Sequence, residues 1–183
     1  MFDAEIDGIQ LRFVTSPALF SPNGLDAGTR AMLSLVAFPA RGKILDLGCG
    51  YGAVGIYAAK LAGEEYVTMS DVDEAAVAAA KENAALNGVT GVRVILSDGF
   101  DGIGDAGYAV ILSNPPYHAD FSVAKRFIEK GFNRLAVGGK FYMVTKRETW
   151  YKNKFTSVFG GVTVRERDGY FVFIAEKRTE NRG

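Results

Sequence analysis

The sequence predicts an α/β protein built on a mostly parallel sheet that is closed by an antiparallel hairpin. Short apolar runs typical of buried strands alternate with segments of helical period through most of the chain. A strand that follows a helix in such an alternation returns parallel to the strand before it. Near the end, Asp168-Gly169 separates two runs of alternating β-branched and aromatic residues, 162–167 and 170–176, which is a strong hairpin signal.

The elements are expected in a simple order along the chain. The N-terminal segment contains one or two short strands and a helix from about Asp26 to Phe38. Asp73 is placed as the N-terminal cap of a helix that Asn87-Gly88 ends. Further strands are expected at 43–47, 66–70, 92–96, 108–112 and 140–145, and helices at 53–59, 73–87 and 121–136. A basic stretch, 146–158, precedes the hairpin.

Length and composition indicate one domain in a reducing compartment. A chain of 183 residues supports one sizeable core and is short for two ordinary domains. No apolar run approaches the ~20 residues that span a bilayer. The acidic start, residues 1–5, is unlike a signal peptide. The single cysteine, Cys49, allows no internal disulfide, so we expect a cytoplasmic protein with no membrane partner.

A proline-rich motif, Asn114-Pro115-Pro116-Tyr117, follows the apolar run 108–112. Two consecutive prolines stop the strand and fix an extended turn. The Asn114 side chain and the Pro115 carbonyl then face outward, where both can accept hydrogen bonds from a planar amino group. Tyr117 offers a ring face for stacking on that group. Taken alone, the motif is equally well explained as a plain strand-ending turn.

A glycine loop precedes the helix at 53–59 and holds Gly48, Gly50 and Gly52 at alternate positions. Glycines allow a sharp turn and let a ligand approach the amides of a helix N-terminus. The spacing differs from the G-x-G-x-x-G of dinucleotide-binding folds, and no P-loop Lys-Ser/Thr follows. Asp46, just before the loop, would repel a pyrophosphate and suits a cationic ligand. Cys49 is interpreted as a small filler in this loop.

Two more aspartates follow the next two strands. Asp71 lies 25 residues beyond Asp46, where an acidic residue can bind the two hydroxyls of a ribose. Asp98 can accept a hydrogen bond from an adenine amino group, with Phe100 or its neighbours as a wall for the ring. Each aspartate alone is also explained as a cap or turn residue. Because ligands bind beyond the carboxyl ends of strands in open α/β sheets, four polar strand ends, including Asn114, predict one crevice.

These motifs together resemble the class I S-adenosylmethionine-dependent methyltransferases. Residues 20–29, Phe-Ser-Pro-Asn-Gly-Leu-Asp-Ala-Gly-Thr, and residues 114–118 more narrowly resemble the small-subunit ribosomal RNA guanine methyltransferases that modify the 2-amino group. The similarity runs from about Phe13 to Lys177. Larger ribosomal members of that family also carry an extra N-terminal domain, which this sequence does not contain.

The resemblance implies a Rossmann-like methyltransferase fold, with a mostly parallel seven-stranded sheet and helices on both faces. It implies S-adenosyl-L-methionine as the methyl donor and S-adenosyl-L-homocysteine as the product. No metal is expected, because one histidine and one cysteine give no ligand cluster. The expected cofactor-binding residues are Asp46, Gly48, Cys49, Gly50, Gly52, Asp71, Asp98 and Asn114. The expected catalytic residues are Asn114, Pro115, Pro116 and Tyr117.

The expected roles follow from the positions of these residues. Asp46 holds the methionine end of the cofactor, Asp71 the ribose and Asp98 the adenine. Asn114 and the Pro115 carbonyl accept the two amino protons of a flipped-out base, on which Tyr117 stacks. His118 is interpreted as an ordinary loop residue. By the resemblance, Phe20, Asp26, Gly28 and Thr29 close over the methionine end; without it, Asp26 is simply a helix N-cap.

The net charge of zero conceals a division along the chain. Residues 1–120 hold 7 Lys/Arg and 15 Asp/Glu, and residues 121–183 hold 14 and 6, so the two parts carry −8 and +8. Such asymmetry indicates a polyanionic partner. In the basic part, Trp150, Tyr151 and Phe155 are interleaved with cations, which suits phosphates and bases, or else they face inward from a solvated helix. The cations considered are Lys125, Arg126, Lys130, Arg134, Lys140, Lys146, Arg147, Lys152 and Lys154.

We therefore expect a single methyltransferase domain over 1–183, in which 1–40 covers the cofactor, 41–120 binds it and 121–183 faces the substrate. The predicted reaction is methylation of an exocyclic amino group in RNA, first the guanine 2-amino group of small-subunit ribosomal RNA or a ribosomal particle. A protein glutamine amide, or an adenine amino group in RNA or DNA, fits the same turn and remains the alternative. A non-enzymatic nucleotide- or RNA-binding module would need a broken glycine loop, and the glycine spacing disfavours a nicotinamide oxidoreductase. The oligomeric state is not predicted.

Overall fold

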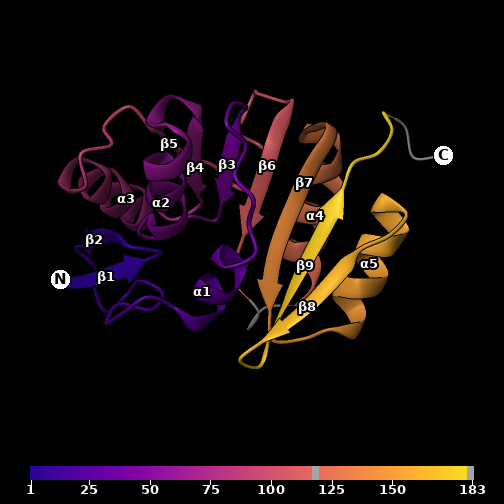
Figure 1. The fold of residues 1–183 in the computed structure, drawn as a ribbon, viewed down its shortest axis with the longest axis horizontal. Helices are drawn as coiled ribbons and strands as arrows, with labels where there is room; N and C mark the ends of the chain where they lie inside the picture. The colour runs from indigo at the N-terminus through magenta and orange to yellow at the C-terminus, as the bar shows by residue number, and fades with distance from the viewer. Residues whose placement is uncertain (117–119, 181–183) are drawn as a thin grey trace.

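A seven-stranded sheet in the order β5-β4-β3-β6-β7-β9-β8 forms the centre of the molecule (Figure 1). The computed structural model describes residues 1–116 and 120–180. Strands β3 to β7 pair in parallel, and β9 runs antiparallel between β7 and β8. The strands are β3 (Ile44–Leu47), β4 (Val67–Asp71), β5 (Arg93–Leu96), β6 (Tyr108–Ser113), β7 (Leu135–Thr145), β8 (Thr163–Arg167) and β9 (Tyr170–Glu176). The predicted fold class is confirmed.

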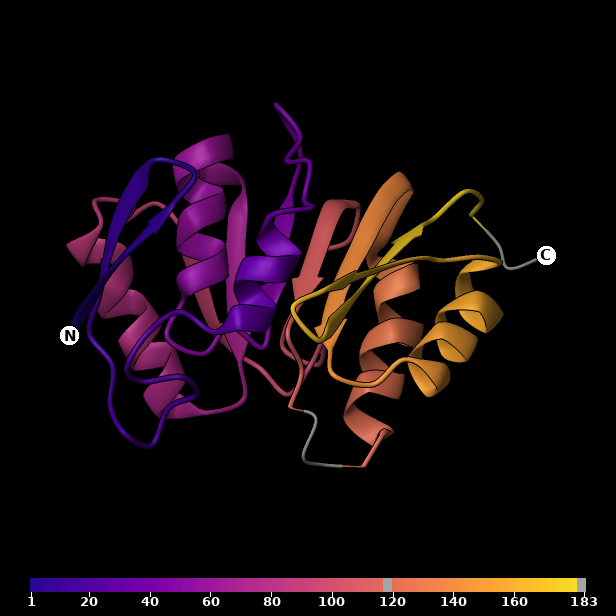
Figure 2. The same ribbon diagram turned by 60° about the horizontal axis from the view of Figure 1, so that its bottom comes forward.

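Helices cover both faces of the sheet, as expected. One face packs against α1 (Ala27–Leu33), α2 (Ala53–Ala62) and α3 (Glu74–Leu86). The separate hairpin of β1 (Phe2–Ile6) and β2 (Ile9–Phe13) contacts α2 and α3. The other face packs against α4 (Ser122–Arg134) and α5 (Thr149–Phe159), which lie side by side (Figure 2). A short 3-10 helix, Glu64–Tyr66, connects α2 to β4.

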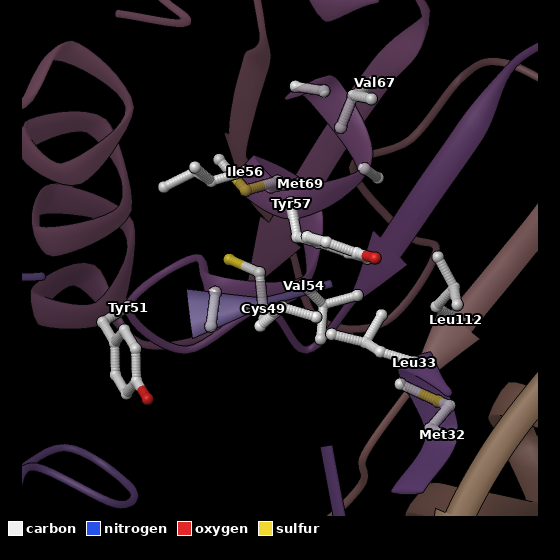
Figure 3. Close-up of a cluster of buried hydrophobic side chains, with 14 of the residues drawn as sticks. Met32, Leu33, Cys49, Tyr51, Val54, Ile56, Tyr57, Val67, Met69 and Leu112 are labelled. Atoms are coloured by element: carbon white, nitrogen blue, oxygen red, sulfur yellow. The ribbon is translucent and has the colours of Figure 1, made fainter. Parts of the chain in front are cut away.

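Strand alternation explains why there are two hydrophobic clusters. In β3, Ile44 belongs to the cluster beneath α1, α2 and α3, and Leu45 to the cluster beneath α4 and α5. Successive side chains of a strand point to opposite faces, so a sheet covered on both sides has strands that are apolar at nearly every position. Figure 3 shows the first cluster, with Ile56 of α2 beside Met69 of β4 and Leu33 of α1 beside Leu112 of β6.

Two predicted helices end earlier than expected. The helix that begins after Asp26 stops at Leu33 and not at Phe38. Ser34 is its C-cap, and the Ser34 Oγ donates to the Ala31 carbonyl at 2.7 Å. The proline at position 39 disfavours helical geometry only in the residue before it, Phe38. The helix expected to reach Ala136 ends at Arg134, and β7 begins at Leu135, which pairs with Tyr108. That early start makes β7 longer than the predicted strand at 140–145.

The C-terminal hairpin forms as predicted, with Asp168 and Gly169 both at positive φ (51° and 81°), the geometry of a two-residue hairpin turn. Its outer strand, β8, is one edge of the sheet, and its exposed side chains include Arg165, Glu166 and Arg167. Among the helices of residues 1–116 and 120–180, none has the length and apolar character needed to cross a bilayer.

Candidate active site

The carboxyl ends of β3, β4, β5 and β6 open onto one cavity of about 350 Å³. Parallel neighbours end at the same edge of a sheet, so this convergence follows from the strand order. The predicted residues that line the cavity are Asp46, Gly48, Cys49, Gly50, Asp71, Asp98, Asn114, Pro115 and Pro116. Gly52 does not line it, and Tyr117, like His118, lies outside the described residues.

The glycine loop takes its shape from left-handed backbone geometry. Gly48, Gly50 and Gly52 all have positive φ (73°, 56° and 101°), which a side chain would strain. The amides of Gly48 and Cys49 both donate to the Ser70 carbonyl, at 2.9 and 2.8 Å, so the loop is held against β4. Gly52 is the N-cap of α2, and a Cβ there would lie 3.3 Å from the Ala80 Cβ. It therefore serves the turn and the packing of α2 on α3.

Cys49 is a buried thiol in this loop. Burial, with the charges of Asp46 and Asp71 added, raises its pKa well above the ordinary value. The thiolate form needed for nucleophilic attack is thus disfavoured. This geometry is consistent with the filler interpretation.

Asp46 is a buried carboxyl at the floor of the cavity, with only 3% of its surface exposed. Its Oδ2 accepts a hydrogen bond of 2.8 Å from the Gly55 amide in the first turn of α2. Burial is the main cause that raises its pKa to about 7, the Gly55 amide opposes that rise, and the charge of Asp71 adds to it. A cation in the cavity would favour the ionised form of such a carboxyl.

Ser70 places a second polar group at the cavity. Its Oγ is buried and has no hydrogen-bond partner within the described part of the chain. A buried hydroxyl without a partner is costly, and here it lines a space where a ligand atom could satisfy it. Asp46 and Ser70 therefore fit a polar, cationic ligand such as the methionine portion of the expected cofactor.

Asp71 and Asp98 are held in different ways. Asp71 accepts from two backbone amides, with Oδ2 2.9 Å from the Gly50 nitrogen and Oδ1 3.0 Å from the Asp73 nitrogen. Asp98 is exposed and forms an ion pair of 3.0 Å with Arg126 of α4. The first carboxylate is fixed by the loop, and the second remains accessible at the rim.

Of the predicted wall, Phe100 or its neighbours, the neighbours Ser97, Asp98 and Gly99 line the cavity and Phe100 does not. Phe100 is only 2% exposed and lies in the core, with the Arg134 guanidinium 5.5 Å from its ring centre. Gly99, at φ 57°, turns the chain so that the next side chain points inward. The apolar lining near Asp98 comes instead from Val72, Val123 and Phe127.

Asn114 is anchored by Asp26, a contact that the sequence did not predict. Its Nδ2 donates to Asp26 Oδ2 at 2.9 Å and approaches Thr29 Oγ1 at 3.3 Å. The same Asp26 oxygen accepts from the Thr29 amide at 2.9 Å, so Asp26 is also the N-cap of α1. Because the amide nitrogen of Asn114 is engaged, its oxygen is the atom left to accept a hydrogen bond from a ligand.

The N-terminal segment contributes one wall of the cavity through Ala18, Leu19, Phe20, Asp26 and Thr29. Phe20 is half exposed. Gly28 does not line the cavity; it packs against the Tyr170 ring, where a Cβ would come within 2.8 Å. Of the residues expected to cover the cofactor, three therefore reach the cavity and Gly28 does not.

The basic part of the chain is partly neutralised by structure. Arg126 and Lys130 pair with Asp98 and Asp101, and Lys154 pairs with Glu129. Arg134 donates to the carbonyls of Ile103 and Asp105. Among these cations, Arg126 alone also lines the cavity.

The aromatic residues of the basic part of the chain differ in how deeply they are buried. Tyr151 and Phe155 are buried in the core, so the inward-facing interpretation is correct for them and they offer no surface to a base. Trp150 is only half-buried. Within the described residues, no group of three or more His, Cys, Asp or Glu is placed to hold a metal ion.

Comparisons with known proteins agree with this geometry. The sequence profile of the methyltransferase small domain family matches residues 10–175. Ribosomal RNA small subunit methyltransferase C of Serratia proteamaculans is 33% identical over 165 residues, covering 88% of this chain and 47% of that protein. The uncharacterized protein YbxB of Bacillus subtilis is 33% identical over 171 residues, covering 90% and 85%. The chain spans about half the length of the ribosomal RNA methyltransferases it matches.

Solved structures show the same relationship. The T. thermophilus 16S rRNA N2 G1207 methyltransferase, in complex with AdoMet and guanosine, superposes with a TM-score of 0.85 at 27% identity, covering 97% of this chain and 50% of that one. A methyltransferase from Pyrococcus furiosus shares the fold, with a TM-score of 0.71 at 21% identity over 92% and 90% of the two chains.

Proposed function

The chain belongs to the methyltransferase small domain family and is an S-adenosylmethionine-dependent methyltransferase domain, and from that premise we propose that it methylates an exocyclic amino group of a base in ribosomal RNA. The first candidate is the 2-amino group of guanine. The observation that carries the proposal is the position of Asn114, which lines a cavity together with several carboxylates and whose amide nitrogen is engaged by Asp26, so that its oxygen is left to accept a hydrogen bond. The guanosine bound by the T. thermophilus relative supports the choice of base.

The cavity residues fit the expected cofactor. Asp46 and Ser70 would hold its charged methionine portion, Asp71 its ribose and Asp98 its adenine ring, with Val72 and Phe127 as apolar neighbours. When bound, S-adenosylmethionine supplies an electrophilic methyl group. The contribution of this chain is to place an amino nitrogen in line with that group and to keep it there.

Asn114 carries most of that positioning. Its oxygen accepts a hydrogen bond from one N–H of the target amino group, and the Pro115 carbonyl is proposed to accept a hydrogen bond from the other N–H. These hydrogen bonds orient the nitrogen and increase the electron density of a lone pair that is otherwise delocalised into the base. The nitrogen becomes acidic as it gains a fourth bond, so its proton can pass to water without a strong general base. Holding two reactants in attack geometry can lower a barrier by several kcal/mol, roughly 7–11 in the best cases.

The target base must leave its stack to reach Asn114. An amino group stacked inside a helix cannot enter the cavity, and flipping a base costs a few kcal/mol, least where the RNA is already single-stranded. We propose that Tyr117, which lies outside the described residues, stacks on the flipped base.

Transfer of labelled methyl groups tests the proposal. The protein is incubated with labelled S-adenosylmethionine and naked small-subunit ribosomal RNA, assembled ribosomal particles or total cell protein, in separate reactions. We expect label in RNA, released by nuclease digestion as N2-methylguanosine, and the better of the two RNA substrates identifies the assembly stage. Label in N6-methyladenosine would overturn the choice of base, and label only in protein glutamine would overturn RNA as the substrate.

A further inference from the structure

We infer that a strip of four residues beside the cavity, Phe121, Lys146, Arg147 and Trp150, binds the single-stranded RNA that flanks the target base. The inference rests on the proposed function, because it concerns the same substrate. It adds a binding surface outside the cavity, with separate tasks for the aromatic and cationic side chains.

The sheet places the strip next to Asn114. Strands β6 and β7 are parallel neighbours with Ser113 opposite Met143, so Asn114 and Lys146 leave the sheet at the same edge (Figures 1 and 2). The turn after β7 is held by Thr145, whose Oγ1 donates to the Arg147 carbonyl at 2.7 Å and accepts from the Arg147 amide at 3.2 Å. The cations therefore emerge from a fixed turn.

Two aromatic rings form the apolar part of the strip. Phe121, at the N-terminus of α4, stacks on Trp150 of α5 with centroids 4.4 Å apart and planes 16° apart. Tyr151 packs against both rings from the core side, with its centroid 5.8 Å from that of Phe121 and 5.1 Å from that of Trp150. Phe121 and Trp150 are half-buried and Tyr151 is buried, so the pair is supported from below while part of it meets solvent.

Both cations of the strip lie over aromatic rings. The Arg147 guanidinium is 5.6 Å from the Phe121 centroid, and the Lys146 ammonium is 5.1 Å from the Tyr170 centroid. Phe121 packs against the cluster beneath α4 and α5, and Tyr170 belongs to the cluster beneath α1, so the strip crosses the carboxyl edge of the sheet from one face to the other. Both residues are exposed, and within the described part of the chain neither has a carboxylate within ion-pair distance. Arg126, Lys130 and Lys154 differ in this respect, because each already pairs with an acid.

This combination favours a polynucleotide over a protein. Unneutralised cations bind phosphates and release counterions, and half-exposed aromatic rings stack on bases of any sequence. Two carboxylates flank the strip. Asp120 is engaged by the Ser122 amide at 2.9 Å, and Glu148 follows Arg147 directly. Lys125, exposed in the first turn of α4, adds a further positive charge nearby.

Trp150 also provides the assay, because it is the only tryptophan of the chain. The full chain is titrated with a ten-nucleotide single-stranded oligoribonucleotide while tryptophan fluorescence is recorded at several salt concentrations. We expect saturable quenching and an affinity that falls as salt rises. Lys146→Ala and Arg147→Ala should each weaken binding and reduce the slope of log affinity against log salt by about 0.7, the value for one phosphate contact on a single strand.

A labelled oligonucleotide tests the ring itself. Trp150→Leu should weaken its binding by roughly 5- to 150-fold, the range for loss of one base–aromatic stack, whereas Trp150→Phe should retain most of the affinity. Lys60→Ala is the matched control: this exposed lysine lies in the last turn of α2, which begins at the cavity and leads away from it. Its removal should change neither affinity nor salt slope.

Failure of the strip and failure of the reaction give different results. If methyl groups reach RNA but none of the strip variants alters oligonucleotide binding, the inference is overturned and the proposed function stands. Quenching of Trp150 by an acidic peptide and not by RNA would also overturn it. Calorimetric titration with S-adenosylmethionine, expected to be the same in every strip variant, shows that each variant retains a folded cavity.

Discussion

The carboxyl edge of the sheet has an acidic side and a cationic side, and they hold their charges differently. Over β3 and β4, Asp46 and Asp71 accept hydrogen bonds from backbone amides of the glycine loop, of α2 and of the N-cap residue that precedes α3. Beyond β7, Lys146 and Arg147 lie over aromatic rings on an exposed surface. Asn114, at the end of β6, stands between them.

The difference corresponds to two kinds of ligand. Carboxylates fixed by backbone amides in a cavity suit a small cation of defined shape. Cations over ring faces can adjust their side chains, which suits a flexible chain of phosphates and bases. We expect substitutions on the acidic side to change only the affinity for the cofactor, and substitutions on the cationic side to change only the affinity for RNA. A substitution of Asn114, at the boundary between the two sides, should change only the rate of methyl transfer.

The largest effect is expected at the boundary. Asn114→Ala should lower the rate of methyl transfer by about 100- to 1,000-fold, the usual effect of removing a preorganised hydrogen-bonding group that acts in the transition state. The affinity for S-adenosylmethionine, measured by calorimetry, should stay within about twofold. Asn23→Ala, in an exposed turn, is the control. Retained turnover would remove Asn114 from the reaction.

A smaller effect is expected from the acidic side. Asp71→Ala removes a charged acceptor, and hydrogen bonds to charged groups contribute about 1.5–3 kcal/mol, so cofactor affinity should fall roughly 10- to 100-fold. Oligonucleotide affinity in the fluorescence titration should not change. If both affinities fell together, the two sides of the edge would not be independent.

The buried Asp46 should make stability depend on pH. The folded protein keeps this proton up to about pH 7, whereas an unfolded chain loses it near 3.8, so the folded state binds more protons between these values. The free energy of unfolding should therefore fall as pH rises from about 4 to 7, by at most about 1.4 kcal/mol per pH unit. Urea denaturation of the native protein and of Asp46→Asn across this range measures the difference, and parallel curves would contradict the prediction.

The smallest effect concerns Asp26, a positioning residue for Asn114. Asp26→Ala frees the Asn114 amide to rotate and should lower kcat about 2- to 10-fold, the worth of one hydrogen bond, with the KM for RNA unchanged. Asp26→Asn keeps an acceptor and should restore most of the rate. Loss of the N-cap alone would cost about 1 kcal/mol of stability without a selective change in kcat. An unchanged kcat in Asp26→Ala would show that Asp26 serves only the helix.

The residues around the cavity could be predicted because each lies at or just beyond the carboxyl end of a strand in a parallel sheet. Asp46, Asp71, Asp98 and Asn114 needed no knowledge of tertiary contacts to be placed together. The contact between Asp26 and Asn114 had no such signal, because the two residues are 88 positions apart and belong to different elements.

Phe100 and the aromatic residues of α5 show two other reasons why the sequence alone did not predict the position of a side chain. A single left-handed residue, Gly99, turns Phe100 into the core, and such a turn cannot be read from local composition. For Tyr151, Phe155 and Phe159 a signal was present, since their spacing of four predicts one buried helical face. The lysines between these residues equally fit an RNA-binding surface, so the buried face was not the only interpretation.

The outer strand β8 has a consequence for how the protein behaves in concentrated solution. An edge strand exposes unpaired backbone groups to which a neighbouring molecule can add its own strand. Along β8, Arg165, Glu166 and Arg167 project into solvent, so a second sheet that docked there would have to desolvate them. The protein is thereby protected against growing into aggregates through this edge.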